Sequence, residues 1–318
     1  MYQSEQENVA ARRVTAVIVH HGDPRRTVRA VLNHCKLGVF ANVIVVANDR
    51  CQRPDDLKDV KCIWLVPPRN IGFGGACQLG AMSCRSDVYA FFNAHVTMDS
   101  ASVECCRAAF DIDNVGIASP YIYHPRSGKP VVDWKYTHCI RTYSRILRLP
   151  IQVPLKKGHI KDHASHPVDL LDNDWASGGA IFCRHEVIKD IGWDGSYFLG
   201  LEDVDISMRA KRSGWRVVTV PSAIAFHTGE STRTSTIAAY YSPRNNLWFA
   251  RRYYGRGIQA LLTTYFLVCL FRVAAADVLK RRWPPHARAA TRGILDGWLL
   301  WPDGMDALLT EPMWLNGD

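Results

Sequence analysis

The chain has 318 residues, of which 47% are hydrophobic and 22% are charged. These values are typical of a folded protein with one large or two small domains, and they exclude a disordered or collagen-like chain. The net charge of +9 is concentrated in residues 244–292, where ten basic residues accompany the single acid Asp277. This uneven distribution argues against a nucleic-acid-binding protein and indicates a basic C-terminal region.

Ten cysteines are spread along the chain. They are too sparse for a disulfide scaffold, and none has the Cys-x-x-Cys spacing of zinc sites or thioredoxin-like redox sites. Residues 1–13 are polar and lack the apolar stretch of a secretory signal peptide. We therefore expect reduced thiols in a cytoplasmic protein with a polar N-terminal tail.

Between residues 14 and 120, short apolar runs alternate with segments of helical character. This alternation predicts an α/β fold of β-α-β units around a mostly parallel, Rossmann-like sheet, in which ligands bind at the carboxyl ends of the strands. The expected strands are 14–19, 42–47, 62–66, 88–93 and 115–119, and the expected helices are 25–37, 73–84 and 99–110.

Polar residues follow the first two expected strands. His21 comes after the first strand, and Asn48 and Asp49 come after the second. An amide or carboxylate at such a position can hydrogen-bond a base or a ribose hydroxyl. Asn, Asp and Gly are also the usual residues of turns, so a purely local role is an equal alternative.

A glycine-rich turn follows the third expected strand and contains Arg69, Asn70 and Gly72. Backbone N–H groups and one guanidinium at the end of a strand suit a phosphate group. The turn matches neither the G-x-x-x-x-G-K-[ST] loop nor the G-x-G-x-x-G dinucleotide fingerprint. By itself it therefore does not identify a nucleotide site.

Residues 121–174 have an irregular pattern with scattered Pro and Gly, and we expect a loop-rich insertion there. Three histidines with i, i+4, i+7 spacing, together with two nearby acids, suggest a metal site on one helix face. Pro167 and its polar neighbours instead favour a loop that is exposed or lines the substrate site. The residues concerned are His159, His163, His166, Asp162 and Asp169.

A dense acidic cluster, Glu202-Asp203-Val204-Asp205, begins an expected helix over 202–214, which leads into an expected strand over 215–220. Near a helix start, backbone N–H groups and the helix dipole stabilise a carboxylate. Such a carboxylate can act as a general base toward a hydroxyl group within hydrogen-bond reach. The alternative is the ordinary preference for acids in the first turn of a helix.

Three helices are expected at the C-terminal end, over 237–254, 258–280 and 286–300. The apolar run 258–271 has fourteen residues, fewer than the roughly 20 that a helix needs to span a bilayer. Because Lys280, Arg281, Arg282 and Trp283 follow it, an interfacial helix on an anionic membrane is expected. The alternative is a helix packed on the rest of the chain or in a homodimer interface.

Taken in order, these segments resemble family 2 of the inverting glycosyltransferases, especially its rhamnosyltransferase-like branch. The resemblance covers about residues 14–250, with Gln78 replacing an Asn of the family pattern and FFNAH standing at the position of L-N-P-D. The matching segments are VTAVIVHHGD, IVVANDR, RNIGFGGACQLG, FFNAH, DWASGGAIFCRHE, YFLGLEDVDISMRAKRSGW and AFHTGES.

The resemblance implies a GT-A fold over residues 14–235, with a nucleotide-binding half over about 14–120 and an acceptor half over about 121–235. Residues 236–318 would form a basic helical extension. The implied reaction moves a sugar, with L-rhamnose from dTDP-rhamnose as the first guess, to a hydroxyl of a polysaccharide or lipid-linked oligosaccharide. The protein would then lie on the cytoplasmic face of the inner membrane and take part in bacterial surface glycan synthesis.

The resemblance also assigns roles to individual residues. Asp203 would be the catalytic base, and Glu202 would orient groups at the reaction centre. The sugar and acceptor pocket would be shaped by Trp175, Ser177, Gly178 and Gly179. The donor would be bound by His21, Asn48, Asp49, Arg69, Asn70, Gly72, Asn93 and Arg244.

The family's metal-binding acid is replaced here by His95, so dependence on a divalent cation, Mn²⁺ or Mg²⁺, is an open question. His227 would supply a second ligand, and imidazole suits Mn²⁺ better than Mg²⁺. Alternatively, Arg69, Arg233 or Arg244 would neutralise the leaving diphosphate. A third possibility is an inactive protein that binds a nucleotide-sugar or a glycan as an assembly partner.

Overall fold

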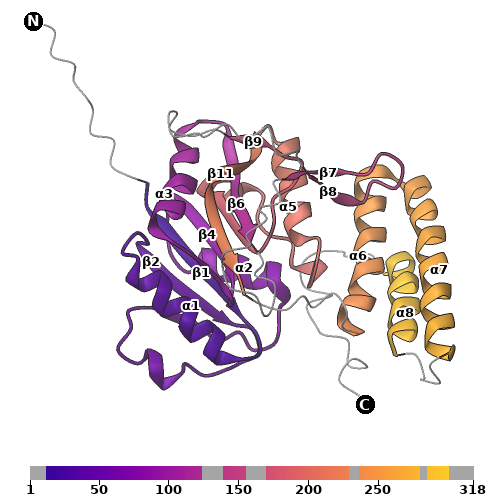
Figure 1. Ribbon diagram of the computed structural model, residues 1–318, viewed down its shortest axis with the longest axis horizontal. Coiled ribbons are helices and arrows are strands. Elements are labelled where there is room, and N and C mark those ends of the chain that lie inside the picture. The colour runs from indigo at the N-terminus through magenta and orange to yellow at the C-terminus, as the bar shows by residue number, and fades with distance from the viewer. Residues whose placement is uncertain (1–11, 124–138, 155–169, 229–235, 280–284, 301–318) are drawn as a thin grey trace, which may run out of the picture.

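The computed structural model describes residues 12–123, 139–154, 170–228, 236–279 and 285–300. A twisted sheet with helices on both faces forms the larger part (Figure 1). Three further helices from the end of the chain stand beside it. The predicted α/β fold with a mostly parallel sheet and a C-terminal helical extension is therefore confirmed.

The described strands of the main sheet run in the order β3-β2-β1-β4-β10-β6-β11-β5, and β9 pairs with β11. β1, β2, β3 and β4 are mutually parallel, whereas β10 is antiparallel to both β4 and β6. The strands are β1 Val14–His20, β2 Asn42–Ala47, β3 Ile63–Leu65, β4 Val88–Asn93, β5 Val96–Met98, β6 Val115–Tyr123, β9 Leu171–Asp172, β10 Ala180–Arg184 and β11 Arg216–His227.

The reversed direction of β10 places its first residue at the carboxyl end of β4, where Ala180 is opposite Phe92. At the end of β4, the Asn93 backbone N–H donates to the carbonyl of Gly179 over 3.3 Å. β11 is parallel to β6 and antiparallel to β5, with His227 opposite Val96. The ends of β4 and β11 and the start of β10 therefore meet at one edge of the sheet.

Two apolar layers hold the helices to the sheet, because alternate side chains of a strand point to opposite faces. In β1, Ala16 and Ile18 lie in the layer that includes α1 and α3, whereas Val17 and Val19 lie in the layer that includes α2, α4 and α5. These helices are α1 Pro24–Lys36, α2 Gly72–Met82, α3 Ser100–Ala108, α4 His185–Asp190 and α5 Glu202–Arg212.

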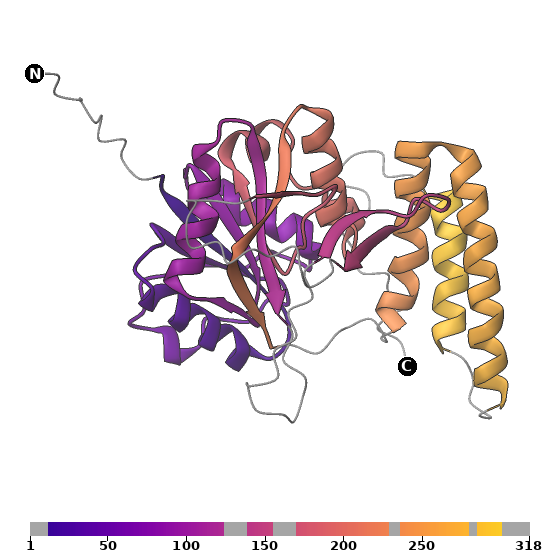
Figure 2. The same ribbon diagram turned by 45° about the horizontal axis from the view of Figure 1, so that its top comes forward.

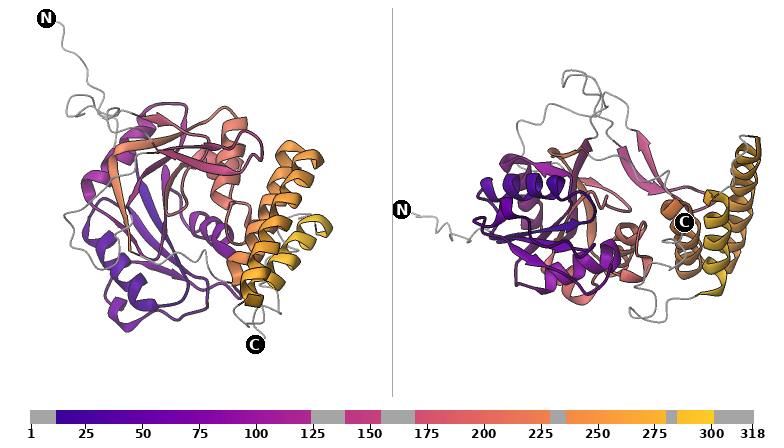
Figure 3. Two further views of the ribbon diagram at one scale, coloured as in Figure 1. Left: turned by 45° about the vertical axis from the view of Figure 1, so that its right-hand side comes forward. Right: turned by 90° about the horizontal axis from the view of Figure 1, so that it is seen from below.

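The C-terminal extension consists of α6 Thr236–Tyr254, α7 Arg256–Leu279 and α8 Pro285–Leu299. Leu247 of α6, Leu262 of α7 and Ile294 of α8 share one apolar cluster. A hairpin of β7 Cys139–Tyr143 and β8 Pro150–Pro154 reaches from the sheet toward this bundle (Figures 2 and 3). None of the helices in the described part of the chain has both the length and the apolar character needed to cross a membrane.

Several expected elements differ from the structure. The strand expected over 215–220 continues to His227, and the strand expected over 115–119 continues to Tyr123. The two strands, β11 and β6, still pair at Phe226 and Tyr123, beyond a register shift between Val220 and Ile224. The expected loop-rich insertion contains the hairpin β7–β8. β10 was not among the expected strands, and its five residues are all buried between β4 and β6.

Candidate functional site

The expected nucleotide-contacting residues lie at the carboxyl ends of β1 and β2. Asp49 accepts hydrogen bonds from the backbone N–H of Gly22 over 2.7 Å and of Cys51 over 3.1 Å. Its carboxyl lies 3.4 Å from the ring of His20. Burial raises the pKa of Asp49, but these N–H groups and the histidine outweigh it and leave the pKa lowered. Backbone N–H groups of the local turns therefore donate to both oxygens of this carboxylate, and a contact with the donor stays a prediction.

Asn48 joins the end of β2 to the glycine-rich turn. Its buried side-chain amide donates to the carbonyl of Gly72 over 3.0 Å and accepts from the backbone N–H of Ile71 over 2.9 Å. Asn70 caps the same turn by accepting from the N–H of Gly72. Arg69 precedes the turn with an exposed side chain. Asn48 and Asn70 thus shape the turn, while Arg69 remains accessible to a phosphate.

His21 also has an exposed side chain, at the carboxyl end of β1. Asn93, at the end of β4, is partly buried next to Gly179. Both residues therefore lie on the same edge of the sheet as Asn48 and Asp49. Their contacts with a donor stay predictions.

Gly72 begins α2 in a left-handed conformation, with φ of +71°. A Cβ atom on this residue would lie 2.5 Å from the carbonyl oxygen of Phe198 and 2.6 Å from its Cα. The adjacent Phe73 donates its backbone N–H to that same carbonyl over 2.8 Å. Only glycine fits this close approach, which ties the donor side of the site to the turn that precedes α5.

Asp203 lies in the first turn of α5, after Leu201 in a left-handed conformation. One carboxylate oxygen accepts the backbone N–H of Gly178 over 2.8 Å, and the other accepts the N–H of Val204 over 2.8 Å. The side chain is only partly buried. Asp203 is therefore a carboxylate that two backbone N–H groups hold at a partly exposed position, which suits a general base.

Glu202, the neighbouring acid, is buried beneath α2, and its Cβ lies 3.3 Å from the position of a Cβ on Gly74. Burial, followed by repulsion from Asp203, raises its pKa to about 8. Glu202 is therefore mainly protonated near neutral pH. Adjacent carboxyl groups whose environments separate their pKa values can take different roles.

The residues that are expected to shape the sugar and acceptor pocket lie between Asp203 and the end of β11. Trp175 is buried against Tyr197 and Phe249. Ser177, Gly178 and Gly179 follow it and are partly exposed. A Cβ on Gly178 would lie 3.2 Å from the Asp203 carboxylate, and one on Gly179 would lie 3.6 Å from the His227 ring. The small residues therefore keep backbone close to both groups.

His95 and His227 come together although they are 132 positions apart in the sequence. Their Nε2 atoms are 3.0 Å apart and the two rings are nearly perpendicular, at 82°. Two nitrogen ligands at about 2.1 Å from one cation, and about 90° apart, are separated by about 3.0 Å. The same separation also fits a hydrogen bond between two neutral imidazoles.

The family resemblance predicts a divalent cation at this position. Within the described ranges, no cluster of three or more His, Cys, Asp or Glu side chains could hold a metal ion. A site with two protein ligands is nevertheless suited to a cation that takes its other ligands from substrate phosphates. His95 and His227 fit such a cation, and their nitrogen atoms favour Mn²⁺ over Mg²⁺.

Arg244, expected to bind the donor, has other partners. Its side chain is 2% exposed, and Nη2 donates to the backbone carbonyls of Ser196 and Tyr197, each over 2.9 Å. This guanidinium holds the backbone of the chain itself, so it is not placed to neutralise the diphosphate. Its neighbour Asn245, which was not among the expected site residues, contacts the same segment.

Several candidate residues lie outside the described residues. They are Arg233 and the proposed cluster His159, His163, His166, Asp162 and Asp169.

No protein-family model matches the chain. One segment of 54 residues is 39% identical to N-acetylglucosaminyl-diphospho-decaprenol L-rhamnosyltransferase of Mycobacterium tuberculosis. This match covers 17% of the chain and spans only 18% of the length of that relative.

Two solved structures are similar over most of the chain. One is GalNAc-T7 with UDP, GalNAc and Mn²⁺, with a TM-score of 0.60 and 15% identity over 77% of this chain and 48% of that one. The other is the mannosyltransferase PcManGT of Pyrobaculum calidifontis with GDP-Man and Mn²⁺, with a TM-score of 0.52 and 11% identity over 93% and 89%. These similarities, together with the sheet order, show that the chain has the GT-A fold.

Proposed function

We propose that the chain is a glycosyltransferase that moves a sugar from a nucleotide diphosphate donor to an acceptor hydroxyl with inversion at the anomeric carbon. The observation that carries this proposal is the position of Asp203. Its carboxylate is held by the N–H groups of Gly178 and Val204, close to the edge where the His95–His227 pair lies. A base and a pair of cation ligands at the carboxyl edge of a GT-A sheet match the needs of this reaction.

In the proposed reaction, Asp203 takes the proton of the acceptor hydroxyl while the hydroxyl oxygen attacks the anomeric carbon. The bond between that carbon and the donor diphosphate breaks, and the diphosphate leaves with the electron pair. Attack from the side opposite the leaving group inverts the anomeric centre. Glu202 holds its proton near neutral pH, so it adds little negative charge beside Asp203.

His95 and His227 would hold a divalent cation, for which Mn²⁺ is proposed. When bound, this cation would supply positive charge that stabilises the departing diphosphate. The support is the 3.0 Å separation of the two Nε2 atoms and the Mn²⁺ named with both similar structures.

For the finer assignment, we propose L-rhamnose from dTDP-rhamnose as the donor sugar. The support is the 54-residue similarity to a relative named as an L-rhamnosyltransferase that acts on a decaprenol-linked diphospho-sugar. The proposed acceptor is a lipid-linked oligosaccharide or a polysaccharide in bacterial surface glycan synthesis. We also propose a location on the cytoplasmic face of the inner membrane.

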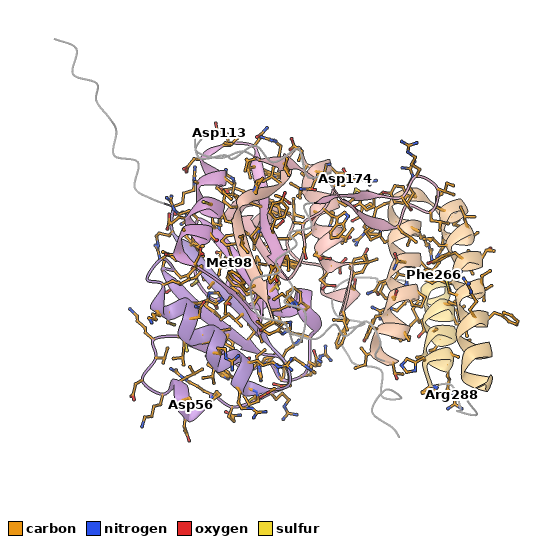
Figure 4. All side chains as sticks on the ribbon, in the orientation of Figure 1. Asp56, Met98, Asp113, Asp174, Phe266 and Arg288 are labelled. Atoms are coloured by element: carbon orange, nitrogen blue, oxygen red, sulfur yellow. The ribbon has the colours of Figure 1, made fainter. Side chains whose placement is uncertain are left out.

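The exposed side chains of the C-terminal helices support the proposed contact with a membrane surface. One face of α7 carries Leu261, Tyr265, Val268 and Phe271, whose side chains are between 41% and 76% exposed. The exposed Arg272 comes directly after Phe271 in the same helix. In Figure 4, Phe266 labels α7 in the bundle and Arg288 labels the beginning of α8. Apolar side chains beside basic residues fit an anionic lipid surface.

Vesicle co-sedimentation tests the membrane contact. Binding to phosphatidylglycerol vesicles should fall several-fold in Phe271→Glu and in vesicles of phosphatidylcholine alone. Equal binding in all three cases would contradict the assignment.

A donor screen by mass spectrometry tests the proposed function. The purified chain is incubated with dTDP-, UDP- and GDP-sugars, with Mn²⁺ or EDTA, and with or without an extract of lipid-linked glycans. We expect sugar transfer that depends on the acceptor and is lost in EDTA. Binding without turnover would favour the inactive nucleotide-sugar-binding alternative, and donor consumption without acceptor would indicate a hydrolase.

A further inference from the structure

The segment Asp194–Asp205, called here the base-bearing segment, carries Asp203. Apart from one short 3-10 turn and the start of α5, it has no regular structure. Phe198, Gly200 and Leu201 adopt positive φ angles of 62°, 83° and 73°. Such angles are unfavourable for the two residues with side chains and persist only where surrounding contacts hold them.

The first set of holding contacts comes from Asn245 in the middle of α6. Its buried Nδ2 donates to the carbonyls of Tyr197 over 2.9 Å, Leu199 over 2.9 Å and Gly200 over 2.7 Å. An amide has two hydrogens, so one of them is shared between two acceptors. One side chain thus satisfies the carbonyls of the turn that contains the left-handed residues.

Arg244 completes this set. Besides its bonds to the segment, its Nε donates to Oδ1 of Asn245 over 2.9 Å, which fixes the orientation of the amide. The guanidinium carbon lies 4.1 Å from the ring centre of Trp248 and 4.4 Å from that of Tyr241. Aromatic faces and carbonyl dipoles therefore stabilise the buried charge.

A second set of contacts joins the last turn of α6 to both ends of the base-bearing segment. Nη1 of Arg252 lies 2.7 Å from Asp194 Oδ2 and 3.1 Å from Asp205 Oδ1. The hydroxyl of Tyr253 donates to the same oxygen of Asp205 over 2.5 Å. On its other oxygen Asp205 pairs with Arg209 of α5. Asp205 is fully buried, so this acid of the EDVD cluster anchors α5 to α6.

We propose that α6 is a brace that sets the position of Asp203, with Asn245 as its main positioning residue. The C-terminal extension is then part of the catalytic unit rather than only a means of attachment. The brace also reaches the donor side, because Phe73 of α2 donates to the carbonyl of Phe198 within the braced turn. This inference rests on the proposed function of Asp203 as the base.

The full-length variant Asn245→Ala tests the brace. Misplacing a catalytic group by about 1 Å can cost on the order of 100-fold in rate, so kcat should fall by about 30- to 100-fold. The KM for the donor should stay within about threefold of wild type, because the donor-side residues are not altered. Asn246→Ala is the matched control, since within the described residues this amide donates to the Ser242 carbonyl of its own helix and does not reach the base-bearing segment. Its kcat should stay within about twofold.

Two further readouts separate positioning from general loss of folding. Hydrogen–deuterium exchange of peptides covering 194–205 should speed up in Asn245→Ala, while exchange in β1 and β4 stays unchanged. In an Asp203→Asn background, Asn245→Ala should cause no further loss of rate, because both changes act through the same group. Arg252→Met tests the second contact set at a partly exposed side chain, with less risk to folding.

The outcomes are distinct. If wild type transfers sugar but Asn245→Ala and Arg252→Met keep kcat within about twofold, or if the two losses multiply in the Asp203→Asn background, the brace is overturned. If wild type transfers no sugar, the proposed function fails. The exchange experiment then still tests whether α6 holds residues 194–205 in place. Unchanged exchange over these residues in Asn245→Ala would overturn that part of the proposal.

Discussion

Replacing Gly72 with alanine tests the close approach between α2 and the base-bearing segment. Gly72 has φ of +71°, and a Cβ would lie 2.5 Å from the carbonyl oxygen of Phe198. The backbone of Phe198 must therefore move by several tenths of an ångström. That movement also strains the bond from the Phe73 N–H to the same carbonyl.

Three terms give the expected size of the effect. A left-handed conformation costs a residue with a side chain about 1–2 kcal/mol. Overpacking against backbone costs about 1–3 kcal/mol, and loss of the hydrogen bond adds about 1 kcal/mol. Gly72→Ala should therefore lower the free energy of unfolding by about 3–6 kcal/mol.

Gly38 provides a matched control, because its φ of +69° is nearly the same and nothing lies within 4 Å of the position of its Cβ. Gly38→Ala should cost only the conformational term, about 1–2 kcal/mol. The difference between the two variants then isolates the contact with Phe198. We expect this difference to be about 2–4 kcal/mol.

Urea unfolding followed by tryptophan fluorescence measures both variants, and equal m-values ensure that the free energies can be compared. The base-bearing segment should also move, so Gly72→Ala should lose activity while Gly38→Ala keeps it. A difference in unfolding free energy below about 1 kcal/mol would refute the proposed close packing.

Two further predictions concern buried ionisable groups. Because burial raises the pKa of Glu202 from 4.5 to about 8, the folded state keeps a proton that the unfolded chain releases between these values, and stability falls as pH rises through this window. In urea unfolding between pH 5 and 8, the free energy of unfolding of Glu202→Gln should fall less with rising pH than that of the wild type. Equal slopes in the two proteins would contradict the assignment. Arg184→Met removes donors to the carbonyls of Phe110, Ile112 and Val115. It should lower the free energy of unfolding, measured by thermal unfolding, by about 2–4 kcal/mol. A loss no larger than that of an exposed arginine variant would contradict this prediction.

The positions of the central strands could be predicted from the sequence. β1, β2 and β4 are buried on both faces, so they are continuous apolar runs with clear ends. β10 was missed because it is short and follows Ser-Gly-Gly directly. Its antiparallel pairing joins strands that are distant in sequence, which no local pattern encodes.

The roles of individual polar residues were harder to predict. The family resemblance assigned Arg244 to the donor, whereas its side chain is buried. Tyr241 and Trp248 lie three and four positions away on the same face of α6, and this spacing was a usable signal of a buried, stacked guanidinium. The role of Asn245 depends on the path of residues 197–200, which only the tertiary structure reveals.

The candidate site was predicted in part. The strand ends located Asn48 and Asp49, but not the hydrogen bonds that occupy them. The meeting of His95 and His227 followed from the family resemblance rather than from any local pattern. The domain boundaries and the donor and acceptor contacts remain predictions.

The most direct test of the central claim is the transfer rate of Asp203→Asn. Asparagine can still accept the N–H of Gly178, but its amide cannot take up the hydroxyl proton. Asp113→Asn, in the exposed turn before β6, is the control. We predict that kcat of Asp203→Asn falls by about 10²- to 10⁴-fold, while donor binding by calorimetry and the rate of the control are unchanged. Transfer by Asp203→Asn within about tenfold of wild type would contradict the account.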